Sequence, residues 1–298
     1  MSELAKNSYK LPNLELINLL GKGGMSTVWR AKQLSLDRYV AVKILAQDFC
    51  SSQEDIDRFL QEARACARLH HSGIVRVYDA NYSDGIYYIV MELIDGYTMG
   101  EWLRRKAQLP VEDALIILES VAYALDYAWK SFRIVHCDIK PDNIMIDADG
   151  TIKITDLGLS RSILAMHPDV EDEVIGTPAY ISPEQAYGEK ELDCRSDIYS
   201  LGATIYHLLT GRVLFDGQTV TAMMESHVGD PQAPDPREFA PHIQEGLVFL
   251  LERMLAKRRE NRYPDWEDLL RDIARIYEGR RPPRLLMPKP GSSMSVRK

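Results

Sequence analysis

An amide side chain and a carboxylate are the first and last residues of a hairpin predicted in the middle of the chain. Segments 143–147 and 151–156 read as strands and flank Ala148-Asp149-Gly150, which is a strong turn signal. Folding this hairpin brings Asn143 and Asp156 to the same end. Because oxygen donors suit hard cations, we expect these two side chains to share an ion such as Mg²⁺.

A glycine-rich turn precedes a lysine and a glutamate near the N-terminus. Residues 21–28 read Gly-Lys-Gly-Gly-Met-Ser-Thr-Val, and glycines let backbone amides approach phosphate oxygens closely. Glu62 lies within an apolar stripe of a predicted helix over 51–69, where an unpaired carboxylate would be costly. A lone strand lysine is usually a solvated charge. Beside this turn and this acid, Lys43 is interpreted as a phosphate-contacting ammonium held by an ion pair.

The stretch 134–147 and the Asp156-Leu157-Gly158 that follows it resemble the eukaryotic-type (Hanks-type) protein kinases, in particular bacterial members. The resemblance runs from about Leu14 to Tyr277. It implies that Asp138 orients a substrate hydroxyl and accepts its proton, while Asn143 and Asp156 hold Mg²⁺, with Mn²⁺ as an alternative.

The resemblance also implies an ATP site and a protein-substrate site. Lys43 and Glu62 would position the ATP phosphates, and Lys140 together with Thr177 is typical of the Ser/Thr branch. Further residues expected to contact ATP are Gly21, Lys22, Gly23, Gly24, Met25, Ser26, Val28, Ala41, Met91, Glu92, Ile94 and Met145.

Four residues are expected to serve the fold of the site rather than its chemistry. Glu184 ends the stretch 176–184, which resembles the family's substrate-side loop, and Arg262 is its expected buried partner. An exposed pair worth little is the alternative. Residues 197–202, which begin with Asp197, resemble the buried helix that anchors the family's catalytic loop. His136 is expected to be a packing histidine, not a base.

The order of expected strands and helices along the chain predicts an α+β fold with two lobes, resembling that of protein kinases. Residues 1–13 are an N-terminal extension, 14–94 a strand-rich N-lobe with one main helix, and 95–278 a larger, mostly helical C-lobe, with the hinge at 94–96. Helices are predicted over 110–130, 193–209, 243–255 and 265–277. Residues 279–298 contain several Arg, Lys and Pro but no acid, and they predict a basic, disordered tail.

Three departures from the family pattern bear on activity. Ser26 replaces a glycine of the phosphate turn and Leu157 replaces a phenylalanine, and we expect both to be tolerated. Cys137 stands where many kinases have an arginine that binds a phosphate in the activation segment. The hydroxyls between Gly158 and Gly176 are those of Ser160 and Ser162. The hypothesis is that activity does not require phosphorylation of this segment.

Composition limits the remaining function classes. The chain has 298 residues, of which 45% are hydrophobic, and a net charge of −8, which argues against coating a nucleic acid. No run of about 18 apolar residues predicts a membrane span, and scattered cysteines indicate a reduced, cytoplasmic protein.

Several alternatives stay open at this stage. The basic tail is a solvated linker, or it contacts an anionic surface or a domain missing from this chain. A separate alternative is that this chain is the catalytic piece of a larger receptor. A pseudokinase that binds ATP as a scaffold, and a kinase for a small molecule, are the rival functions. The sequence leaves the oligomeric state and the substrate unknown, but protein substrates and autophosphorylation are expected.

Overall fold

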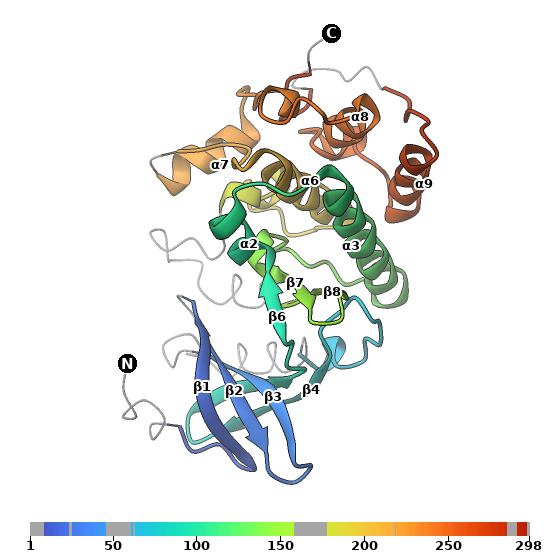
Figure 1. Ribbon diagram of the computed structural model, residues 1–298. Helices are drawn as coiled ribbons and strands as arrows, with labels where there is room; N and C mark the ends of the chain where they lie inside the picture. Colours follow the sequence, from blue (N-terminus) through green and yellow to red (C-terminus); the bar gives the residue numbers. More distant parts are fainter. Residues whose placement is uncertain are drawn as a thin grey trace.

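A small strand-rich lobe and a larger helical lobe make up the chain, as seen in the computed structural model of Figure 1. The structure describes residues 9–23, 26–45, 61, 63–157, 178–217, 219–284 and 291–296. The arrangement confirms the predicted α+β fold with two lobes. None of the helices in these ranges combines the length and apolar character that crossing a membrane requires.

Five antiparallel strands form the N-lobe sheet, in the order β1-β2-β3-β5-β4. They are β1 (Leu14–Lys22), β2 (Ser26–Gln33), β3 (Arg38–Leu45), β4 (Val77–Ser83) and β5 (Ile86–Met91). Lys22 pairs with Thr27, so the glycine-rich turn lies at the tip of the predicted β1–β2 hairpin. Asp84 and Gly85 both have a positive φ, of 51° and 81°, which suits the tight turn between β4 and β5.

Strand β3 divides its side chains between two faces, as its alternation predicts. Val42 and Ile44 are buried in the apolar core of the N-lobe. Ala41 lies on the opposite face and packs against Met91. Lys43 shares the face of Ala41 and reaches a carboxylate of the C-lobe. The face that carries Lys43 is therefore the one turned toward the other lobe.

The C-lobe combines a three-stranded sheet with seven helices in the ranges described. The sheet pairs β6 (Gly96–Thr98), β7 (Ile144–Asp147) and β8 (Ile152–Ile154) in that order. The helices are α2 (Met99–Lys106), α3 (Val111–Phe132), α5 (Pro183–Ala186), α6 (Cys194–Thr210), α7 (Val220–Val228), α8 (Glu245–Met254) and α9 (Trp266–Tyr277). Short 3₁₀ turns include η3 (Pro141–Asn143) and η4 (Pro178–Tyr180).

The four helices predicted in the C-lobe are confirmed as α3, α6, α8 and α9, each within two residues at either end. Helix α6 shows why such ends can be predicted: the Asp193 side chain accepts from the Arg195 N–H at its start, and Gly211 at its end has a φ of 69°. For the helix predicted over 51–69, residue 61 and residues 63–66 are helical, and the rest lies outside the described ranges.

The prediction of a disordered tail is wrong for the parts of residues 279–298 that the structure describes. Arg284 makes two hydrogen bonds of 3.0 Å to the Glu252 carboxylate on α8, and Pro282 packs on Gly246 of the same helix. Residues 291–296 then insert between two C-lobe segments. Their order comes from partners on α8 and in the lobe, which the composition of the tail alone does not reveal.

Candidate active site

The β7–β8 hairpin brings Asn143 and Asp156 to one end, as the sequence predicts. Ile144 pairs with Ile154, and the Thr155 N–H donates to the Asn143 carbonyl at 3.0 Å. Asp156 follows directly and takes a left-handed φ of 62°, which is uncommon for a residue other than glycine. Backbone strain of this kind concentrates at functional sites, so the conformation of Asp156 marks this end of the hairpin as a candidate centre.

Lys43 crosses from the N-lobe sheet to this end of the hairpin. Its Nζ lies 2.7 Å from Asp156 Oδ1, and the two side chains are 10% and 23% exposed. Burial alone would raise the pKa of Asp156, but the nearby ammonium of Lys43 lowers it below its usual value. Asp156 is therefore held ionised. Glu62, the partner predicted for Lys43, lies outside the described residues.

Asp138 is bound by one cation and one amide from its neighbours in the same loop. Lys140 Nζ lies 2.8 Å from Asp138 Oδ2, and Asn143 Nδ2 donates to the same oxygen at 3.0 Å and to the Asp138 carbonyl at 2.8 Å. These contacts fix the carboxylate in one orientation. Because the amide nitrogen of Asn143 is occupied in this way, its Oδ1 is the atom left to serve as a ligand.

The buried carboxylate of Asp197 anchors the catalytic loop, the segment around His136, Cys137 and Asp138. The backbone N–H groups of His136 and Cys137 donate to the two oxygens of Asp197, at 2.7 and 2.9 Å. Cys137 adopts a φ of 67°, a left-handed conformation that these bonds help to hold. Asp197 belongs to α6, so the loop that carries Asp138 is fixed to a helix that is buried along most of its length.

His136 braces the loop against the strand that leads to Asp156. The Asp138 N–H donates to His136 Nδ1 at 3.2 Å, so that nitrogen carries no proton, and Nε2 donates to the Thr155 carbonyl at 2.9 Å. Burial lowers the pKa of His136 and keeps the ring neutral. A neutral imidazole with both nitrogens engaged holds structure in place and is not available as a base.

The glycine-rich turn leaves space above its backbone. A Cβ added to Gly21 would meet no atom within 4 Å, and one added to Gly23 would meet only the Ser26 carbonyl, at 3.7 Å. Neither glycine has a positive φ. The described residues therefore give no internal reason for glycine at either position. Close approach of an external group such as a phosphate is a reason that fits. Gly24 and Met25 lie outside the described residues.

Apolar residues expected around adenine gather on the face of the N-lobe sheet that carries Lys43. Ala41 and Met91 are buried together, and Val28 and Ile94 pack against them. The Glu92 N–H donates to the Arg76 carbonyl at 2.9 Å, so its carbonyl is the backbone group that Glu92 can offer to a ligand. Met145 lies in β7, opposite Thr98 and Lys153.

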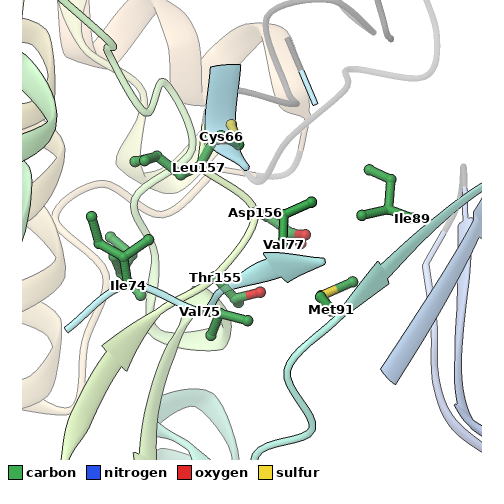
Figure 2. A pocket seen from close by; sticks show the side chains of 10 residues that line it. Cys66, Ile74, Val75, Val77, Ile89, Met91, Thr155, Asp156 and Leu157 are labelled. Atoms are coloured by element: carbon green, nitrogen blue, oxygen red, sulfur yellow. The ribbon is translucent and has the colours of Figure 1, made fainter. Parts of the chain in front are cut away.

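A small cavity of about 20 Å³ lies between the lobes beside Met91 (Figure 2). Figure 2 shows Ile89 and Met91 on the N-lobe side and Asp156 and Leu157 on the C-lobe side. The Cys66 thiol donates to the Leu157 carbonyl at 2.9 Å. This volume holds about one water molecule, so the lobes are nearly in contact here.

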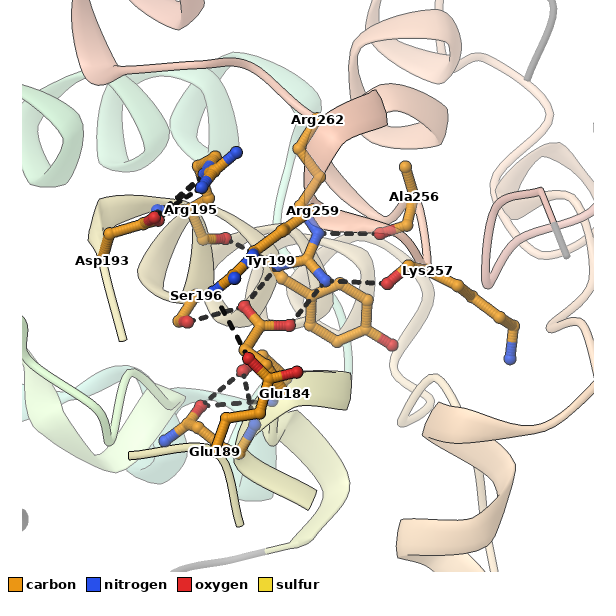
Figure 3. Close-up of polar contacts among 12 residues, drawn as sticks. Glu184, Glu189, Asp193, Arg195, Ser196, Tyr199, Ala256, Lys257, Arg259 and Arg262 are labelled. Atoms are coloured by element: carbon orange, nitrogen blue, oxygen red, sulfur yellow. Dashed lines mark hydrogen bonds and ion pairs between the residues drawn. The ribbon is translucent and has the colours of Figure 1, made fainter. Parts of the chain in front are cut away.

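Glu184 and Arg262 form a buried, two-pronged ion pair (Figure 3). Arg262 Nη1 and Nη2 donate to the two Glu184 oxygens at 2.7 and 2.8 Å. Its remaining donors bind three backbone carbonyls, those of Arg195, Ala256 and Lys257. The pair therefore ties the end of the substrate-side stretch to α6 and to the segment after α8, and it is not an exposed pair.

Burial would raise the pKa of Glu184, but the Arg262 guanidinium and the Ser196 hydroxyl lower it below its usual value. Ser196 donates to Glu184 Oε1 at 2.6 Å. The sequence reasoning does not identify Ser196, nor Gln185, whose Nε2 donates to the Cys137 carbonyl at 2.8 Å. Only their proximity in sequence to Asp197 and Glu184 could have indicated these roles. Thr177 lies outside the described residues.

The donor set at the hairpin end suits Mg²⁺ better than a transition metal. Within the described ranges no cluster of three or more His, Cys, Asp or Glu could hold a metal by itself. One amide oxygen and one carboxylate, from Asn143 and Asp156, are the small protein contribution typical of Mg²⁺ that also binds substrate phosphates and water. The residues present therefore fit a nucleotide-bound magnesium ion.

Comparison with known proteins points to one family. Residues 14–272 match the family model described as protein kinase domain. The chain is 36% identical over 267 residues to the serine/threonine-protein kinase PrkC of Bacillus subtilis, covering 90% of this chain and 41% of that protein. It is 37% identical over 274 residues to the serine/threonine-protein kinase PknA of Mycobacterium tuberculosis, covering 90% of this chain and 62% of that protein.

The chain thus spans less than two thirds of the length of these bacterial relatives. Among solved structures, the kinase domain of PknI from Mycobacterium tuberculosis superposes with a TM-score of 0.72 at 27% identity, covering 90% of this chain and 96% of that one. Sequence motifs, fold and relatives agree, and the resemblance predicted from the sequence is confirmed. The chain belongs to the protein kinase family, in its bacterial Hanks-type branch.

Proposed function

We propose that this chain transfers the γ-phosphoryl group of ATP to serine or threonine hydroxyls of protein substrates. The observation that supports this best is the grouping of Lys43 and Asp156 at 2.7 Å with Asp138 and Asn143 at 3.0 Å. Phosphoryl transfer requires positioning and charge neutralisation more than covalent chemistry, and this set offers a cation, two carboxylates and an amide oxygen.

Each residue of the set would have a distinct role. Asp138 would orient the attacking hydroxyl and accept its proton. The new bond from that oxygen to the γ-phosphorus would form as the bond to the β–γ bridging oxygen breaks, and ADP would leave. Asn143 and Asp156 would hold Mg²⁺ or Mn²⁺, and Lys43 would neutralise phosphate oxygens. When bound, ATP and the metal supply the transferable group and the charge that balances it. Lys140 lies 2.8 Å from Asp138 and would contact the phosphate being transferred.

The remaining ATP contacts would come from the N-lobe. Gly21 and Gly23 would let backbone amides approach the phosphates, and Ala41 with Met91 would border the adenine. The names of the relatives, together with Lys140, support serine and threonine over tyrosine as the acceptors. We also propose autophosphorylation and a cytoplasmic location for this domain.

The test compares wild type with Asp138→Asn in transfer of labelled phosphate from ATP to a generic basic protein in the presence of Mg²⁺. The expected result is transfer by the wild type and loss of about 10³-fold or more in the variant, because the base and its orientation are removed. A folded wild type that binds ATP but transfers no phosphate would contradict the proposal and favour a pseudokinase.

A further inference from the structure

The C-terminal segment (residues 291–296) makes one β-bridge to each of two parts of the C-lobe and lies between them. On one side, the Lys257 N–H donates to the Gly291 carbonyl at 2.9 Å and the Ser293 N–H to the Leu255 carbonyl at 2.8 Å. On the other, Ala233 exchanges two bonds of 2.8 Å with Ser293 and Ser295. Four backbone hydrogen bonds therefore hold the segment from two sides, and main-chain bonds of this kind are what bind an extended peptide to a protein surface.

Side chains of the C-terminal segment are part of the C-lobe interior. Met294 is 1% exposed and belongs to the main apolar core of the lobe, and Ser293 is fully buried. Ser295, two residues later, is exposed to solvent. A side chain as large as methionine in such a place contributes about 2 kcal/mol or more through burial, so the segment is bound and does not merely lie on the surface.

Ser293 begins a chain of hydrogen bonds that leads toward the substrate side. Its Oγ lies 2.8 Å from the Tyr199 hydroxyl, which lies 2.7 Å from His227 Nδ1. His227 sits near the end of α7, against the backbone of Pro178 and Ala179 in η4. Its Nε2 is buried, yet it makes no well-formed hydrogen bond with the described residues. The ring therefore supports η4 by contact, from a position set through Tyr199.

A second connection reaches the other end of the substrate-side stretch, of which the structure describes residues 178–184. The Arg262 guanidinium lies 4.9 Å from the centre of the Tyr199 ring, and Arg262 holds Glu184. Figure 3 shows Tyr199 beside this ion pair, with Lys257 next to it. Tyr199 thus contacts groups that support both ends of the stretch, while its hydroxyl is bound by the C-terminal segment.

Lys257 joins the C-terminal segment to α7 independently. Its backbone N–H binds Gly291, and its ammonium donates to the Ser226 carbonyl at 2.9 Å and lies over the Phe215 ring. Phe215 in turn meets the His227 ring edge-on at 4.9 Å. Removing the segment would therefore loosen α7 from two directions.

We propose that the C-terminal segment is a positioning element for the protein substrate, holding the substrate-side stretch in place through Tyr199 and His227. The groove between Ala233 and Leu255–Lys257 is its binding site. This groove accepts an extended peptide with a small hydroxyl side chain followed by methionine. The inference rests on the proposed kinase function for its consequence, but binding in the groove can be measured without activity.

The first test uses two matched substitutions, Ser293→Asp and Ser295→Asp. A carboxylate at 293 would have to be buried in the C-lobe interior and would weaken binding of the segment, whereas one at 295 would remain in solvent. For Ser293→Asp we expect KM for a peptide substrate to rise about fivefold or more, with KM for ATP unchanged. Hydrogen exchange at residues 178–187 should become faster in the same variant, and Ser295→Asp should match wild type in both measurements.

The second test removes residues 291–298 and supplies a synthetic peptide of residues 291–296 in trans. Binding of the labelled peptide, measured by fluorescence anisotropy, should be accompanied by recovery of KM for substrate and of slow exchange at residues 178–187. A peptide with aspartate at the position of Ser293 should neither bind nor restore.

Three results would overturn the proposal. The first is equal behaviour of Ser293→Asp and Ser295→Asp. The second is a lower kcat together with a higher KM for both substrates in Ser293→Asp, with no local change in hydrogen exchange. The third is binding of the peptide that leaves hydrogen exchange at residues 178–187 unchanged. If the truncated chain does not fold, the paired aspartate variants decide alone. If no variant and no wild type transfers phosphate, exchange and binding still test the positioning role, while the Asp138→Asn comparison tests the function.

Discussion

Lys43 Nζ lies 2.7 Å from Asp156 Oδ1, and this ion pair joins strand β3 of the N-lobe to the end of the C-lobe hairpin. The lysine was predicted to pair with Glu62, which lies outside the described residues. The two ion pairs are compatible with each other, since the lysine ammonium has three donors and can bind more than one carboxylate. The pair makes the ionised state of Asp156 depend on a residue from the opposite lobe.

Replacing Lys43 by Met should therefore affect stability as well as activity. It leaves the mostly buried Asp156 carboxylate without its main cation, and we expect the free energy of unfolding at pH 7 to fall by about 1–3 kcal/mol. Denaturant unfolding measures this. Lys32→Met removes the exposed ion pair with Asp37 and is the control, with little expected change in the free energy of unfolding. Equal losses in both variants would contradict the argument.

Replacing Arg262 by Lys should destabilise the C-lobe strongly. A lysine has three donors and no planar fork. At least two of the five acceptor oxygens, which belong to Glu184, Arg195, Ala256 and Lys257, would therefore lose their partner. We expect a loss of about 3 kcal/mol at pH 7 by denaturant unfolding. Arg271→Lys, at an exposed pair with Asp268, is the matched control and should change little.

The loss in free energy of unfolding caused by Arg262→Lys should also depend on pH. Glu184 has a pKa below its usual value of 4.5, so its ionised pair stabilises the fold above that pH and loses this effect as the pH falls through the lowered value. The difference between wild type and Arg262→Lys should be largest near neutral pH and shrink toward and below pH 4.5. A difference that grows on acidification would show that the carboxylate is not the relevant partner.

Replacing Gly23 by Ala should separate nucleotide binding from stability. A Cβ there meets only the Ser26 carbonyl at an ordinary distance, so we expect the unfolding midpoint to stay unchanged. KM for ATP should rise about tenfold because the backbone can no longer approach the phosphates as closely. Gly85→Ala, at a φ of 81° far from the site, should show the reverse: lower stability and an unchanged KM.

Replacing Ser160 and Ser162 together by Ala tests whether the activation segment needs a phosphate. Cys137 cannot bind a phosphate as an arginine would, and in the structure it is buried. We expect the rate of phosphate transfer to stay near wild type. A loss beyond about tenfold, roughly 1.4 kcal/mol of barrier, would refute the hypothesis.

Local sequence signals predicted the parts of the fold that depend on neighbours in the chain. The alternation around Lys43, the turn between β7 and β8, and the capped ends of α6 are signals of this kind. The sequence reasoning did not predict β4, a polar edge strand whose pairing is decided by β5. It also missed α2, although Thr98 and Glu101 form a capping box at its start.

What could not be predicted depends on contacts between distant segments. The C-terminal segment contains glycine and serines with no strand signal of its own, and it is ordered by carbonyls and amides of residues 233 and 255–257. The partners of Arg262 come from three separate places in the chain. Motif spacing named the residues of the candidate site, but their orientation follows from such long-range bonds.

The saturated guanidinium of Arg262 has a practical consequence for watching this protein in solution. Its five N–H protons are all donated inside the lobe, to Glu184 and three carbonyls, and the side chain is shielded from solvent. Arginine side-chain protons in water usually exchange too quickly to give sharp nuclear magnetic resonance signals. Those of Arg262 should stay visible as separate resonances, and their disappearance would report loosening of the C-lobe before the whole domain unfolds.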